Sequence, residues 1–143
     1  MDGTRTPIHL WIVGGLSALW NAFGCLNYLM TQTRNPDFLA AFTPEQRAYF
    51  ENFPPAMEAA WAFGVWGAIA GSLLLLVRSR HAVAALAVSL AGLAISTFYQ
   101  YVLASPPPVG EDAWMAYMPI VIWAIAIALL VYALRMRRRR VLR

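Results

Sequence analysis

Four stretches of the chain are apolar without interruption, rather than on one face alone. They cover residues 8–30, 55–77, 82–103 and 114–134. A helix needs about 20 apolar residues to cross the hydrocarbon core of a membrane, and a buried helix of a soluble protein rarely keeps so long a run. The pattern predicts an all-α membrane protein, a four-transmembrane-helix bundle in which residues 1–143 form a single membrane domain. The first run is too long for the apolar core of a signal peptide, so we expect it to remain as a helix.

The link between the first two runs, residues 31–54, carries the signals of two short helices. Asn35 precedes Pro36 as an N-cap, and Thr43 precedes Pro44 with Gln46 placed to complete a capping box. We predict short amphipathic helices over residues 36–41 and 44–52, with one apolar side formed by Phe38, Leu39, Phe42, Tyr49, Phe50 and Phe53. Such helices either lie flat on the membrane face or form a lid over a pocket in the bundle.

Short links join the remaining runs. The third link begins near residue 104 and contains three consecutive prolines, which predicts an extended segment. Asp112 is placed to cap the fourth helix, and Pro119 is expected to kink it.

Charge predicts how the chain crosses the membrane. Only 13% of the residues are charged, against about a quarter in a soluble domain. All eleven basic residues are arginines, and nine of them fall on one side: Arg5, Arg78, Arg80 and the six arginines of the tail, residues 135–143. The positive-inside rule then places both termini in the cytoplasm and the link 31–54 outside. The net charge of +4 is thus a topology signal and does not predict nucleic-acid binding. The arginine-rich tail is also predicted to attract anionic lipid.

Polar side chains inside the apolar runs are the candidate site. An amide or carboxyl group that faces lipid lacks a hydrogen-bond partner, so these groups are expected to face protein or trapped water. The outer third of the bundle holds most of them, and the candidate ligand-binding residues are Asn21, Asn27, Tyr28, Glu58, Ser96, Tyr99 and Gln100. They act either as hydrogen bonds between helices or as the lining of a pocket for a small polar solute such as a sugar.

Small residues line the second predicted helix. Ala60, Gly64, Gly67, Ala68 and Gly71 recur at spacings that allow another backbone to approach closely. This surface is first a packing surface, and it is also a possible seam between copies of the chain in a homo-oligomer.

Catalytic chemistry has little support in the sequence. Cys25 is the single cysteine, so no internal disulfide or cysteine-based zinc cluster is expected. His9 and His81 are predicted at the cytoplasmic edge, far from the candidate polar cluster. We therefore predict no enzyme activity, no metal and no cofactor.

One long segment resembles a known family. The run "LWNAFGCLNYLMTQTRNPDFLAAFTPEQRAYFENFP", followed by "EAAWAFGVWGAIAGSLLLLVRSR", resembles small proteobacterial inner-membrane proteins that are often labelled "sugar transporter". The four-helix plan is also similar, by architecture alone, to the DoxX-type proteins. The resemblance implies a multi-pass protein of the bacterial inner membrane that binds or moves a sugar-like solute. Because four helices rarely enclose a full transport pathway, we expect such a carrier to work as an oligomer. A non-catalytic accessory subunit of a larger membrane complex fits the sequence equally well.

Overall fold

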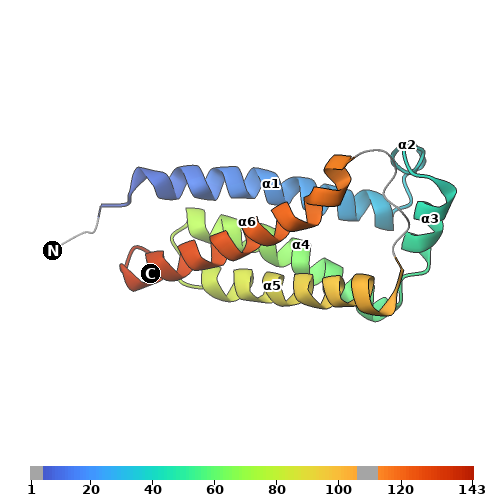
Figure 1. Cartoon of the computed structure of the whole chain (residues 1–143). Helices are drawn as coiled ribbons and strands as arrows, with labels where there is room; N and C mark the ends of the chain where they lie inside the picture. The colour runs from blue at the N-terminus through green and yellow to red at the C-terminus, as the bar shows by residue number, and fades with distance from the viewer. Residues whose placement is uncertain (1–4, 106–112) are drawn as a thin grey trace.

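The computed structural model describes residues 5–105 and 113–143, and long helices dominate it (Figure 1). Four helical segments are long and apolar enough to cross a membrane. They are α1 (Ile8–Gln32), α4 (Pro55–Leu76), α5 (Ala82–Phe98) with the π-helical turn η1 (Tyr99–Leu103) that continues it, and α6 (Ala113–Arg138). The predicted all-α membrane bundle of four spans is confirmed.

Helix α4 is the centre of the bundle. It packs against α1 and against α5, while α6 packs against α5 (Figure 1). The α4–α5 interface is the most extensive, because glycines let the two backbones approach. Ser89 Oγ donates a hydrogen bond of 2.6 Å to the carbonyl oxygen of Gly64 across this interface.

The glycines of α4 face α5 and leave no seam of small residues for a second copy of the chain. A Cβ added at Gly67 would lie 3.1 Å from the Ala85 carbonyl oxygen, and one added at Gly71 would lie 2.6 Å from the Leu86 side chain. The suggestion that this stripe forms an oligomer seam is therefore wrong, because the neighbouring helix of the same chain already occupies it.

The two ends of the bundle differ and are called the arginine end and the loop end. The arginine end carries the link between α4 and α5 and the C-terminal residues of the chain (Figure 1). All four long helices contribute to its apolar core, whose buried residues are Leu10, Leu75, Ala82, Val83, Leu86, Leu129, Ala133, Met136, Val141 and Leu142. His9 and Tyr132 add a hydrogen bond of 2.6 Å between α1 and α6 at this end.

The loop end carries the two short helices α2 (Pro36–Leu39) and α3 (Pro44–Glu51) (Figure 1). Both were predicted from their capping residues, and the capping is confirmed. Asn35 accepts a hydrogen bond from the backbone nitrogen of Phe38, and Thr43 and Gln46 form a reciprocal capping box. Each helix begins at its predicted proline and ends one or two residues earlier than predicted. The three prolines of the third link and the proposed cap Asp112 lie outside the described residues.

Three helices end in the same local conformation. The residue after the C-cap of α1, and those that follow α4 and α6, have positive φ angles: 51° at Arg34, 59° at Arg78 and 56° at Arg140. In each case the next residue donates its backbone N–H to a carbonyl five residues earlier, as Ser79 does to Leu74 at 2.8 Å. This is the Schellman ending, in which the left-handed position is usually glycine.

Candidate functional site

Helix α3 packs its apolar side against the loop end of α4 and α5. The rings of Tyr49 and Phe53 meet edge to face with centroids 5.0 Å apart, and Phe53 meets Tyr99 at 6.1 Å in the same manner. On the other side, Phe50 stacks on Trp61 at 6.2 Å. These contacts dock α3 on the loop end of the bundle through aromatic rings, a position that fits both the flat-lying and the lid interpretation.

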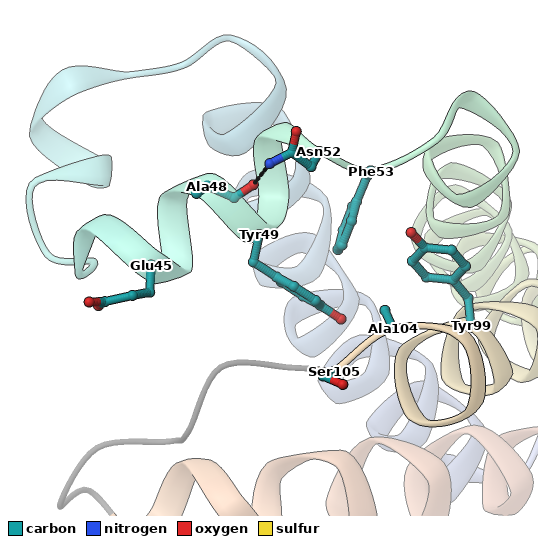
Figure 2. A pocket seen from close by; sticks show the side chains of 8 residues that line it. All are labelled: Glu45, Ala48, Tyr49, Asn52, Phe53, Tyr99, Ala104 and Ser105. Atoms are coloured by element: carbon teal, nitrogen blue, oxygen red, sulfur yellow. Dashed lines mark hydrogen bonds between the residues drawn. The ribbon is translucent and has the colours of Figure 1, made fainter.

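A cavity of about 380 Å³ lies beneath α3, between that helix and the end of η1 (Figure 2). Its lining residues are Glu45, Ala48, Tyr49, Asn52, Phe53, Tyr99, Ala104 and Ser105. Aromatic rings form the inner wall, while polar groups of α3 and Ser105 lie around them. The lining therefore combines apolar faces with hydrogen-bonding groups, the usual composition of a small-molecule site.

The hydroxyl group of Tyr49 has no hydrogen-bond partner within the described residues, although it is buried. Such a group is uncommon, because a buried hydroxyl left unpaired destabilises the fold. Burial raises the pKa of Tyr49 above its ordinary value of 10.0, and the nearby Tyr99 and Tyr101 raise that pKa further. Tyr49 is therefore a neutral phenol at physiological pH, with an O–H able to donate to a bound molecule.

The π-helical turn shapes the opposite wall of the cavity. The backbone nitrogen of Ala104 donates to the carbonyl oxygen of Tyr99 at 2.8 Å, a contact that spans five residues. A π turn holds an extra residue, so each side chain beyond it is rotated from the position that a regular α-helix would give. Tyr99, Ala104 and Ser105 reach the cavity from this turn. The sequence analysis did not anticipate η1, because no residue in "YQYVL" signals a π turn.

Of the seven predicted site residues, Tyr99 is the one that lines the cavity. Tyr28 is half-buried and does not line the cavity; its ring meets Trp61 edge to face at 5.0 Å. Five of the cavity's polar or aromatic residues were not among the predicted ligands: Glu45, Tyr49, Asn52, Phe53 and Ser105. Glu45, Tyr49 and Asn52 belong to the predicted helix 44–52, for which a lid over a pocket was one of two interpretations.

Asn21 holds helices together rather than lining the cavity. Its Nδ2 donates to Ser72 Oγ at 2.9 Å and to the Ala68 carbonyl oxygen at 3.3 Å. Ser72 in turn donates to the same carbonyl at 3.0 Å. The expectation that Asn21 faces protein is confirmed, in the form of hydrogen bonds between helices α1 and α4.

Asn27 departs from that expectation. Its side chain is exposed near the end of α1, so the prediction that it faces the bundle interior is wrong for the single chain. It lies five residues before Gln32, the last residue of α1, at a depth where headgroups or water can reach an amide.

The remaining predicted residues are partly or fully covered. Ser96 is buried, and its Oγ lacks a hydrogen-bond partner within the described residues. Gln100 is half-buried in η1. Glu58 is half-buried in the first turn of α4, where the positive end of the helix dipole favours a carboxylate. None of these three side chains lines the cavity.

Comparisons with known proteins do not indicate a function for the chain. No family model matches the chain, and neither does any curated protein or any solved structure. Within residues 5–105 and 113–143, no three His, Cys, Asp or Glu side chains gather closely enough to hold a metal ion. The chain is an integral membrane protein by its four apolar spans, and its activity has to be inferred from the cavity.

Proposed function

We propose that this chain binds a small polar solute, of the size and chemistry of a sugar, in the cavity beneath α3. In this proposal the chain lies in a bacterial inner membrane with both termini in the cytoplasm, and the cavity opens to the outside. The orientation follows from the positive-inside rule, because the acidic side chains of the described residues lie at the loop end and most arginines at the other. The observation that carries the proposal is the cavity itself, with the unpaired Tyr49 hydroxyl beside it.

The lining favours a solute with both hydroxyl groups and an apolar face. Tyr49 supplies an O–H without a partner among the described residues. Asn52 uses its Nδ2 to donate to the Ala48 carbonyl at 2.7 Å, so its amide oxygen is the atom available to accept a hydrogen bond from a solute. The ring of Phe53 supplies a flat apolar surface in the same wall (Figure 2). Sugars present hydroxyl groups at their edges and C–H groups on their faces, so they match both kinds of contact.

The charge of the cavity disfavours anions. Glu45 is a lining carboxylate, and no basic residue lines the cavity among residues 5–105 and 113–143. The nearby Arg47 is engaged elsewhere, because its Nε and Nη2 both donate to the Phe42 carbonyl, at 3.2 and 3.1 Å. We therefore expect neutral solutes to bind, cationic ones to be tolerated, and acidic sugars to bind poorly.

The test compares two matched tyrosine variants in lipid nanodiscs. Neutral hexoses are titrated and detected by saturation-transfer NMR, first on the unmodified chain. Tyr49→Phe removes only the free hydroxyl and is expected to weaken hexose binding by about two- to twelvefold, the worth of one hydrogen bond. Tyr28→Phe makes the same change outside the cavity and is expected to leave binding unaltered.

Two results would overturn the proposal. One is the absence of hexose binding to a folded chain, and the other is equal binding by the unmodified chain, Tyr49→Phe and Glu45→Gln. Glu45→Gln is included because it removes the carboxylate of the lining without changing its shape. It is expected to admit acidic sugars that the unmodified chain excludes.

A second candidate is an accessory subunit of a larger membrane complex. Helix α6 supports it, because 11% of the most apolar stretch of α6 is buried, against 22–33% for the other three spans. The large side chains that this leaves exposed include Trp114, Tyr117, Ile120, Val121 and Ile127. Gentle purification followed by mass spectrometry tests this candidate, which requires a stoichiometric protein partner to be retained.

A further inference from the structure

The C-terminal residues fold back onto the link between α4 and α5. Arg80 donates its backbone N–H to the carbonyl oxygen of Arg143 at 2.8 Å, and Arg143 donates to the carbonyl of Arg78 at 2.7 Å. The Nε of Arg78 also donates to the Val141 carbonyl at 3.1 Å. Val141 and Leu142 are buried beneath these contacts. The backbones of four arginines, Arg78, Arg80, Arg140 and Arg143, are thereby fixed in one compact group, the arginine knot.

Two of these arginines occupy positions that glycine would fill more easily. Arg78 and Arg140 have φ angles of 59° and 56°, a conformation that costs a residue with a Cβ about 1 kcal/mol or more. The same helix endings in other proteins usually carry glycine. An arginine side chain at such a helix end can compensate the helix dipole or bind a negatively charged partner, and Arg34 holds the same position at the loop end.

No acidic side chain lies beside the knot in the part of the chain that the structure describes; the acidic group within the knot is the carboxyl group of Arg143, whose oxygen accepts the Arg80 N–H at 2.8 Å. The described acidic side chains, Asp37, Glu45, Glu51 and Glu58, lie on α2, α3 and the first turn of α4, which are at the loop end. The buried Nη2 of Arg78 lacks a hydrogen-bond partner as well. The Arg78 side chain is half-buried and its Nε is paired, so an anion held next to the knot would instead compensate the positive charge of the exposed Arg80, Arg140 and Arg143.

Helix α5 adds to the positive electrostatic potential at the arginine knot. It begins at Ala82, two residues after Arg80, with no acidic residue in its first turn and no side-chain cap. The positive end of its dipole adjoins the knot, where the N–H groups of Ala82 and Val83 donate to the carbonyls of Ser79 and Arg80. Arginine side chains beside a helix N-terminus are a favourable setting for a phosphate group.

The position of the knot favours a lipid over a soluble anion. Helix α4 has 22 residues, which at 1.5 Å per residue spans about 33 Å, close to the thickness of the hydrocarbon core. The link that follows it therefore lies at the level of the lipid headgroups. This holds whichever way the chain is inserted, so it does not depend on the proposed orientation.

We propose that the arginine knot binds the phosphate of one anionic phospholipid. The proposal differs from a diffuse attraction of the tail, in which every arginine near the surface would contribute equally. It is independent of the solute cavity, which lies at the opposite end of the bundle.

Native mass spectrometry of the full chain in a neutral detergent tests it. Short-chain phosphatidylglycerol is titrated beside short-chain phosphatidylcholine, and one tightly held phosphatidylglycerol is expected per chain. Arg140→Gly is the main variant, because glycine suits the backbone there and the fold should be kept. Arg80→Gln removes a charge from the link without touching a left-handed residue. The control is Arg137→Gln, which removes one charge from an exposed position on α6, outside the knot.

The two knot variants are expected to lose roughly tenfold or more in phosphatidylglycerol affinity, as for loss of a charged hydrogen bond. The control is expected to lose no more than about fivefold, the effect of one charge near an anionic surface. Equal losses in all three variants, or equal binding of phosphatidylcholine, would overturn the site. Complete competition by millimolar inorganic phosphate would overturn the lipid as its occupant.

Discussion

The close approach of α4 and α5 at Gly92 gives the sharpest test of the fold. A Cβ added at Gly92 would lie 2.6 Å from the Ala60 carbonyl oxygen and 2.7 Å from the Gly64 backbone nitrogen. Both obstructing atoms belong to the backbone, so no side chain can rotate away to make room. Gly92→Ala therefore forces the two helices apart along their most extensive interface.

The expected effect is a loss of stability large enough to measure. Overpacking costs typically 1–3 kcal/mol, and a backbone obstruction belongs at about the upper value. Alanine recovers about 1 kcal/mol through its better helix propensity. We expect Gly92→Ala to lower the free energy of unfolding by roughly 2 kcal/mol.

Gly15→Ala is the matched control, because an added Cβ there has no atom within 4 Å. It is expected to be neutral or to stabilise by up to about 1 kcal/mol. Unfolding of both variants is followed by circular dichroism as sodium dodecyl sulfate is added to mixed micelles. If Gly92→Ala proves as stable as Gly15→Ala, the two backbones do not approach as described.

Three further predictions concern single side chains. Asn21→Leu removes the hydrogen bonds to Ser72 and Ala68 and is expected to lower the free energy of unfolding by about 0.6 kcal/mol, and by no more than about 1.7 kcal/mol. The same unfolding assay measures this change, and unchanged stability would contradict the role of Asn21 in joining α1 to α4. Thr43→Ala breaks the capping box and is expected to destabilise α3 by about 1 kcal/mol, seen as faster amide hydrogen exchange in α3 alone. The pKa of Tyr49 is raised in the folded chain, so the stabilisation it gives is present below pH 10.0, its ordinary value, and is lost as the pH rises through the folded pKa. Alkaline titration at 295 nm should show that Tyr49→Phe removes one late-titrating phenol.

The fold could be predicted from the sequence because two simple quantities determine it. The length of each apolar run gives the spans, and all four match observed helices. Capping residues give the short helices, since Asn35 and Thr43 satisfy donors that any helix start leaves free. The π turn after Phe98 was missed, because it depends on how α5 ends beneath α3 rather than on local propensity.

The site was harder to predict, since helical spacing says that a polar residue faces protein but not which atom it meets. The partners of Asn21 are an α4 carbonyl and Ser72, and identifying them requires the register between α1 and α4. Tyr49 and Asn52 were counted as parts of an amphipathic loop helix. Their role at the cavity depends on where α3 docks, which is a tertiary contact.

The packing of the bundle explains why the cavity lies at the loop end instead of deep among the predicted polar residues. Between α4 and α5 the backbones meet at Gly64 and Gly92, and this contact fills the space that a solute at that depth would need. In the same interface the Ser89 hydroxyl already donates a hydrogen bond to the Gly64 carbonyl. The side-chain amide of Asn21 likewise already donates to α4. The cavity lies instead at the ends of the helices, where α3 and η1 diverge from the packed core. A solute that bound between α4 and α5 would have to separate the two helices. Because Gly92→Ala also forces these helices apart, it would then increase solute binding as well as destabilise the chain.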